Sequence, residues 1–140
     1  MSTLNSDILV SQVMILMNRI PLVDENAIMK EAMEEMGKKR LGIACIVNIN
    51  KDLLGILTDG DIRRKLMRVQ KPFSAILIDD ALDYSIRAPS KIKPDEKLIR
   101  AVELMEEKQI WDLPVVSNEG KLVGLLHLHP AVQALLGMQK

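Results

Sequence analysis

Two stretches of the chain share one order of apolar and polar positions. In the first, apolar residues recur three and four positions apart between residues 27 and 40, with charged residues opposite, which predicts an amphipathic helix ending near Gly37 to Arg40. The apolar runs 42–48 and 53–58 follow, separated by the turn residues Asn-Ile-Asn-Lys-Asp, and predict a β-hairpin. A second helix is expected from Asp59, because acidic residues open it and basic residues follow, as the helix dipole prefers.

The second stretch repeats this order. It predicts a helix over 95–109, strands over 113–117 and 122–128, and a closing helix from Pro130, whose missing N–H suits the first helical position. The two stretches align at a shift of 69 positions, as from Ala32 to Ala101, with no gap up to Ile62. The chain therefore contains a duplicated unit.

Each copy predicts a short strand, a helix, two strands and a helix. The short strands are expected near Pro21–Val23 and Ile92–Pro94. The predicted fold class is α/β (α+β), with tandem βαββα repeats. Because a unit of about sixty residues buries its own core poorly, we expect the repeats to pack sheet to sheet about a pseudo-twofold axis, which creates two equivalent clefts.

The predicted organisation has four segments, one of which is a partly helical connection between the repeats. These segments are an N-terminal linker at 1–9, repeat 1 at 10–69, a connecting linker at 70–89 and repeat 2 at 90–137.

Composition excludes several classes of function. The formal net charge is zero, so the basic field of a nucleic-acid-binding protein is missing. The single cysteine, Cys45, lies in an apolar run and is interpreted as a core residue, and the absence of a disulfide framework suits the cytoplasm. No window is apolar over the roughly 18 residues that a membrane span needs, so we expect a cytoplasmic protein without a membrane partner.

The candidate chemistry of copy one lies in the stretch GILTDGDIRR, residues 55–64. The hydroxyl of Thr58 and the backbone N–H groups of the following helix can hold a phosphate. The carboxylate of Asp61 suits paired ribose hydroxyls, and Arg63 or Arg64 can reach phosphate oxygens. The alternative interpretation is that Thr58 and Asp59 only cap the helix.

Copy two departs from this pattern. At the same shift His127 replaces Thr58, and Pro130 replaces Asp61, so the ribose-binding carboxylate is missing. His127 and His129 stand two positions apart, and they are candidates for an anion site, for a metal site, or for packing and capping alone. Trp111 stands where copy one has Gly42. It is a candidate to cover the second cleft or a dimer surface, and the alternative is a surface side chain without a function.

These residues resemble a known family. The tandem βαββα unit with a Gly-apolar-apolar-Thr-x-x-Asp phrase is similar to the CBS domain (cystathionine-β-synthase domain), and the pair resembles a Bateman module. The phrases VSQVM, RIPLV, KKRLGIACIV, GILTDGDIRR and GLLHLH resemble the C-terminal regulatory region of bacterial arabinose 5-phosphate isomerases. The start of the phrase ILVSQVM corresponds to the joint after the isomerase domain, which favours a fragment, although a free-standing protein stays open.

The resemblance implies a regulatory ligand-binding module without catalytic residues or metal ligands of its own. The implied ligand-binding residues are Pro21, Ala44, Thr58, Asp59, Asp61, Arg63, Leu113, His127 and His129. No cofactor is required, and the implied regulatory ligand is an adenine nucleotide (AMP, ADP or ATP) or CMP-Kdo, the nucleotide-activated sugar acid of the Kdo pathway of lipopolysaccharide biosynthesis.

The implied partners are a sugar-isomerase catalytic domain in a parent chain and a second copy of the chain. The apolar positions expected to form the homodimer are Leu66, Met67, Val69, Val132, Leu135 and Leu136. Two alternatives stay open. One is a structural dimerisation module without a ligand, and the other is a free-standing pair that regulates another enzyme in trans.

Overall fold

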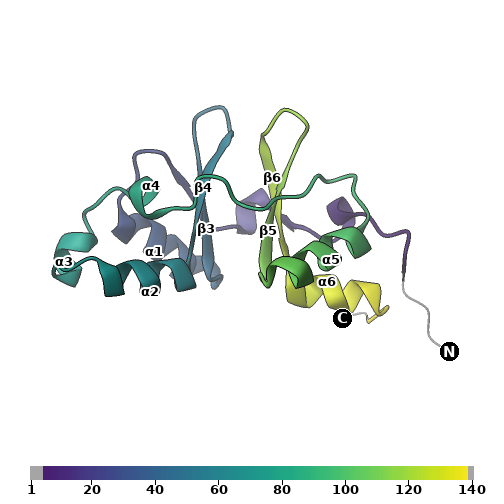
Figure 1. Ribbon diagram of the computed structural model, residues 1–140. Coiled ribbons are helices and arrows are strands. Elements are labelled where there is room, and N and C mark those ends of the chain that lie inside the picture. The colour runs from purple at the N-terminus through teal and green to yellow at the C-terminus, as the bar shows by residue number, and fades with distance from the viewer. Residues whose placement is uncertain (1–4, 139–140) are drawn as a thin grey trace. The chain divides into compact units, whose positions relative to one another are not determined.

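The computed structural model describes residues 5–138 of the chain (Figure 1). These residues form two compact units. Unit 1 contains the residues up to Asn18 together with those from Ser90 onward, and unit 2 contains Arg19–Pro89. Each unit holds one three-stranded sheet with helices packed on it. The mixed α/β class predicted from the sequence is confirmed.

The sheet of unit 2 has the order β2-β3-β4, with β2 parallel to β3 and β3 antiparallel to β4. Helix α1 packs against β2 and β3, and α2 packs against β4. The elements of unit 2 are β2 (Leu22–Asp24), α1 (Met29–Lys39), β3 (Ile43–Val47), β4 (Leu53–Thr58), α2 (Asp59–Arg68), α3 (Phe73–Ile76) and α4 (Ala81–Tyr84).

The sheet of unit 1 has the order β1-β6-β5, and both of its pairings are antiparallel. Helices α5 and α6 contact each other and the sheet, as α1 and α2 contact the sheet of unit 2. The elements of this part of the chain are the 3-10 turn η1 (Val10–Gln12), β1 (Ile15–Leu16), the 3-10 turn η2 (Met17–Arg19), α5 (Leu98–Lys108), β5 (Asp112–Val116), β6 (Leu122–His127) and α6 (Leu128–Leu135).

The buried cores of the two units follow the repeat. Seven core residues of unit 2 have counterparts 69 positions later in the core of unit 1. The pairs are Met29 and Leu98, Ala32 and Ala101, Met36 and Met105, Ala44 and Leu113, Ile46 and Val115, Leu57 and Leu126, and Ile62 and Ala131. Burial therefore confirms the duplication inferred from the alternation of apolar and polar residues.

Each core also receives one segment from outside its own helix–strand–strand–helix repeat. Residues 5–16 pack against unit 1, where Leu98 N donates to the carbonyl of Ile8 at 2.8 Å and Val10 is fully buried. Residues 76–87 pack against unit 2 in the same manner, and Met29 N donates to the carbonyl of Asp79 at 2.8 Å. Both segments thus satisfy the first N–H groups of a helix that lacks a side-chain cap.

The same two segments add strand pairing to their sheets. Ile15 pairs with Leu125, and Ile86 forms a single bridge with Ile56, which is the corresponding position. The connection at 70–89 is therefore a structural part of unit 2, and it contains the two short helices α3 and α4.

A polar cluster holds this connection in place. The hydroxyl of Tyr84 donates to the carboxylate of Asp79, which also binds the ammonium of Lys71 at 2.8 Å. The hydrogen bond to Asp79 raises the pKa of Tyr84 to about 12, and Lys71 and then Tyr84 lower the pKa of Asp79. The cluster joins both ends of the segment 71–84.

Two expected boundaries were wrong. Helix α6 begins at Leu128, so Pro130 is its third residue and not its first, although a missing N–H is tolerated throughout the first turn. Helix α5 begins at Leu98 and not at residue 95, because residues 93–96 form a turn and Lys97 is the N-cap. Within residues 5–138, no helix combines the length and the hydropathy needed to cross a membrane.

Candidate functional site

The strand registers of unit 2 bring three predicted ligand-binding positions to one edge of its sheet. The carbonyl of Pro21, just before β2, accepts from Cys45 N at 2.9 Å. Ala44 lies near the start of β3, and Thr58 at the end of β4 pairs with Ile43. Helix α2 begins at the same edge, so Asp59, Asp61 and Arg63 lie directly beyond it.

Thr58 is the N-cap of α2 and forms a compact network with two side chains of the helix. Its hydroxyl oxygen accepts from Asp61 N at 3.1 Å and donates to Asp61 Oδ2 at 2.7 Å. The other carboxylate oxygen of Asp61 accepts from the guanidinium of Arg64, also at 2.7 Å. Thr58 therefore caps the helix, and Asp61 is part of this cap.

The same network leaves a ligand-binding role open to Asp61. Its side chain is 17% exposed, and that of Arg64 is 55% exposed, so their contact lies at the surface of the unit. A carboxylate has about four acceptor positions, and Thr58 and Arg64 occupy two of them. Arg64 is thereby held beside Asp61, whereas Arg63 is exposed at the adjacent helix position.

The other predicted positions of this repeat differ in accessibility. The side chain of Ala44 is fully buried in the core of unit 2, and Pro21 is buried as well. Any ligand contact with these residues would therefore use the backbone. Asp59 is exposed, and its N–H donates to the carbonyl of Gly42 at 3.0 Å, so this donor is already occupied.

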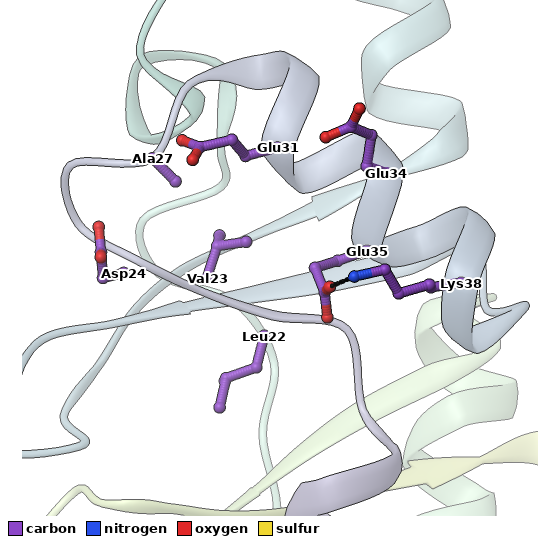
Figure 2. Close-up of a pocket in the computed structure, with 8 residues that line it drawn as sticks. All are labelled: Leu22, Val23, Asp24, Ala27, Glu31, Glu34, Glu35 and Lys38. Atoms are coloured by element: carbon purple, nitrogen blue, oxygen red, sulfur yellow. Dashed lines mark hydrogen bonds and ion pairs between the residues drawn. The ribbon is translucent and has the colours of Figure 1, made fainter.

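A cleft of about 780 Å³ lies between β2 and α1. Figure 2 shows the side chains that line it. The cleft contains none of the predicted ligand-binding residues. Four carboxylates and one ammonium line it, together with apolar side chains, and the lining residues are Leu22, Val23, Asp24, Ala27, Glu31, Glu34, Glu35 and Lys38.

The carboxylates of this cleft have local partners. Asp24 accepts from Asn26 N at 2.8 Å and Glu31 from Ile28 N at 3.0 Å, while Glu35 binds Lys38 at 3.2 Å. An excess of negative charge does not suit a phosphate. The cleft also shares no lining residue with the site at Thr58, so the two are distinct.

In unit 1 the corresponding position carries a cross-strand pair. His127 ends β6 and lies opposite Asp112 of β5, and the two side chains meet at 2.8 Å between Nδ1 and Oδ1. Helix α6 begins after His127, whose side chain does not cap it. Since Pro130 replaces the aspartate of repeat 1, the side chain at the strand end bonds across the sheet instead of along the helix.

The Asp112 carboxylate is largely enclosed, with its side chain 14% exposed. Burial raises the pKa of Asp112, and the hydrogen bond from His127 opposes this effect. Desolvation disfavours the charged carboxylate, and its effect on the pKa is larger than that of the hydrogen bond from His127.

Asp112→Asn is expected to change the pH dependence of stability. A folded-state pKa above the unfolded value of about 3.9 contributes stability below that value and loses it as the pH rises through the folded pKa. The difference between the free energy of unfolding of the variant and that of the wild type should therefore shift in favour of the variant as the pH rises from about 3. Above the folded-state pKa this difference should become constant. Urea unfolding at several pH values measures this difference, with Asp95→Asn, at an exposed position of the same unit, as control. A difference independent of pH would contradict the effect of burial.

The remaining predicted residues of repeat 2 do not gather around His127 in the same way. Leu113 is fully buried in the core of unit 1, while His129 is exposed on the first turn of α6. The strand β6 therefore ends at His127, and His129 lies on a helix and not on the same strand face. Over residues 5–138, no group of three or more histidine, cysteine or acidic side chains is arranged to hold a metal ion.

Sequence reasoning missed Asp112 as a partner of the site. The signal was available, because the repeat alignment sets Asp112 against Ile43, the strand neighbour of Thr58. A polar residue at an otherwise apolar position, opposite a histidine, indicates such a pair.

Comparisons with known proteins identify the repeat. The family of the CBS domain matches twice, over residues 10–68 and 81–129. An uncharacterised protein of Helicobacter pylori (strain J99) is 35% identical over 115 residues, which are 81% of this chain and 33% of that protein. A probable arabinose 5-phosphate isomerase of Haemophilus influenzae is 34% identical over 108 residues, which are 77% of this chain and 31% of that protein. The chain thus spans about a third of the length of these relatives.

Solved structures agree with the fold. The CBS-pair protein CBSX2 of Arabidopsis thaliana, in complex with AMP, has a TM-score of 0.81 at 24% sequence identity, covering 95% of this chain and 99% of that one. CBS pairs are regulatory and not catalytic, as the resemblance of the sequence implies. The chain belongs to the CBS-domain family and consists of a pair of CBS domains.

Proposed function

We propose that this CBS pair binds a nucleotide or a sugar nucleotide at the sheet edge of unit 2 and regulates a sugar-phosphate isomerase in the cytoplasm. The observation that carries the proposal is the hydrogen-bonded arrangement of Thr58, Asp61 and Arg64 at the start of α2, where Arg64 is exposed and the other two side chains are half-buried. A carboxylate for ribose hydroxyls and a guanidinium for phosphate lie there side by side.

Two ligand classes fit this chemistry. Adenine nucleotides (AMP, ADP or ATP) are favoured by the CBSX2 structure, which contains AMP. CMP-Kdo is favoured by the similarity to a probable arabinose 5-phosphate isomerase, because a pathway product is a sensible feedback signal for such an enzyme. Both ligands join a ribose to a phosphate, so the same three side chains serve either.

The parent protein is proposed to be an arabinose 5-phosphate isomerase of the Kdo and lipopolysaccharide pathway. The relatives are about three times longer than the matched region, which leaves room for a catalytic domain outside it. In this arrangement the repeats at 10–69 and 90–137 form one Bateman module.

We also propose that the module forms a homodimer. Among the apolar positions expected at its surface, Met67 is 79% exposed, Leu136 is 53% exposed and Val132 is 36% exposed. Leu66 and Val69 instead pack against the core of unit 2, and Leu135 is buried in that of unit 1. The proposed dimer surface therefore uses Met67, Val132 and Leu136 among these positions.

A thermal-shift screen tests the ligand proposal. AMP, ADP, ATP, CMP and CMP-Kdo are each added to the purified chain, and a ligand at a hundred times its dissociation constant is expected to add about 2.7 kcal/mol to the free energy of unfolding. Inorganic phosphate is the control, because it offers the phosphate without the ribose. If none of these compounds raises the melting temperature, the structural dimerisation module becomes the better function.

A further inference from the structure

A glycine at the start of α2 makes room for the cation of the following turn. The guanidinium of Arg64 donates from Nη2 to Asp61 Oδ1 at 2.7 Å. A Cβ at Gly60 would lie 3.2 Å from Nη2 and 3.3 Å from Nη1 of Arg64, so the guanidinium occupies the space that a side chain at position 60 would need. We call this space the Gly60 notch. Because helical side chains point toward the N-terminus, the cation lies over the first turn of α2 although Arg64 belongs to the second.

This position of Arg64 gains little for the fold. The N-terminus of a helix carries a positive partial charge, which disfavours a cation there. The ion pair with Asp61 compensates only in part, because the side chain of Arg64 is 55% exposed and ion pairs at the surface contribute little to stability. The helix start is, however, where a bound phosphate meets the backbone N–H groups. Arg64 thus supplies a cation at the place where the proposed ligand carries its negative charge.

Repeat 2 lacks every member of this arrangement. At the shift of 69 positions the glycine, the carboxylate and the arginine are all replaced, by His129 for Gly60, Pro130 for Asp61 and Gln133 for Arg64. Helix α6 nevertheless forms at the corresponding place, so these residues are not needed to start a helix after the last strand. They occur together in one copy and are absent together from the other, which indicates that they act as one group.

The charges at this helix start decide which ribose compounds it accepts. Without Arg64, the carboxylates of Asp61 and the exposed Asp59 would suit the neutral hydroxyls of a ribose but would repel a phosphate. A guanidinium has several N–H donors, and the contact with Asp61 uses one of them. Arg64 can therefore keep its contact with Asp61 and bind phosphate oxygens at the same time.

We propose that Arg64, held in the Gly60 notch, makes this site select phosphorylated over unphosphorylated nucleosides. Arg64 is the specificity-determining residue, because its guanidinium binds the phosphate and offsets the negative charge of Asp61. Gly60 is a positioning residue, because a larger residue displaces the guanidinium from the first turn. This selection rests on the ligand site of the proposed function and adds that the phosphate, not the ribose or the base, is the required part of the ligand.

Arg64→Gln tests the charge. It is expected to lower the affinity for AMP about ten- to a hundredfold and to change the affinity for adenosine by less than about threefold, because only AMP carries the phosphate. Glutamine is compatible with the helix, since Gln133 stands at the corresponding position of α6. Calorimetric titration of AMP and adenosine measures the ratio of affinities, and CMP and cytidine form a second pair. Arg68→Gln, at an exposed position of the last turn of α2, makes the same change of charge and should leave both affinities unchanged.

Gly60→Ala tests the position of the cation without removing its charge. The new Cβ displaces the guanidinium of Arg64, so the affinity for AMP should fall about three- to tenfold while that for adenosine stays the same. Alanine favours a helix over glycine, so the melting temperature of the variant should be no lower than that of the wild type. A merely structural role of Gly60 would not separate stability from affinity in this way. Gly37→Ala, on α1, is the matched control, because a Cβ there meets no atom within 4 Å, and it should leave both affinities unchanged.

The outcomes distinguish this selection from the ligand site on which it rests. If the wild type binds AMP and Arg64→Gln binds it equally well, or loses adenosine to the same extent, the selection by Arg64 is overturned and the nucleotide site stands. If Arg64→Gln loses AMP alone but Gly60→Ala binds it as the wild type does, the role of the Gly60 notch is overturned. If the wild type binds neither AMP nor CMP, the ligand site and the selection fail together.

Discussion

Val10→Asp is expected to unfold unit 1. Val10 is fully buried in the core formed with α5 and α6, and its N–H donates to the carbonyl of Glu96 at 2.9 Å. An unpaired carboxylate at this position costs several kcal/mol, which is comparable to the whole free energy of unfolding of a small domain, roughly 5–15 kcal/mol. Amide hydrogen exchange should show lost protection first in α5, β5 and β6.

Ser11→Asp is the matched control for this prediction. Ser11 is exposed, and its N–H donates to the carbonyl of Pro94 at 2.9 Å, a backbone bond that the substitution keeps. The control adds the same charge one residue away and should change the free energy of unfolding by less than about 0.5 kcal/mol. If both variants are equally stable, residues 5–16 are not a part of the core of unit 1.

Asp61→Ala is expected to reduce the affinity for the tightest ligand of the screen by about ten- to a hundredfold. It deletes hydrogen bonds to a charged acceptor, typically worth about 1.5–3 kcal/mol. The main hydrogen bond of the helix cap survives, because the hydroxyl oxygen of Thr58 accepts from the backbone N–H of position 61, which alanine also has. Isothermal titration calorimetry can therefore attribute the loss to the side chain of Asp61.

Three further variants sharpen this test. Thr58→Ala should cost less affinity than Asp61→Ala, although it removes the helix cap at about 1 kcal/mol of stability. His127→Ala should leave the affinity unchanged if the ligand binds within unit 2 alone. Asp83→Ala removes an exposed carboxylate of unit 2, paired with Arg87 at 3.7 Å, and controls for net charge. Equal affinities of the wild type and Asp61→Ala would leave Thr58 and Asp61 with the role of a helix cap only.

The sequence alone predicted the duplication, the helix–strand–strand–helix order of each copy and most bounds of β2 to β6. The strand expected near Ile92–Pro94 was wrong, because Ile92 forms only a single bridge with Val115 and β1 (Ile15–Leu16) completes that sheet.

The correct predictions were possible because burial of apolar side chains imposes a period of two on strands and about 3.6 on helices. Pairs such as Leu57 and Leu126 meet the same requirement in both copies, so their alignment predicted two equal cores. Thr58 at the start of a helix was likewise recognised from local chemistry.

The tertiary structure alone decided which segments complete each unit and which side chains meet at each strand end. Residues 5–16 cap α5 and pair with β6, at a sequence distance over which periodicity carries no information. The contact of His127 with Asp112 likewise depends on the strand register, which places residues 15 positions apart within 2.8 Å of each other. Local patterns record which face of an element is buried, whereas the partner that buries it is fixed by the free energy of the whole packed unit.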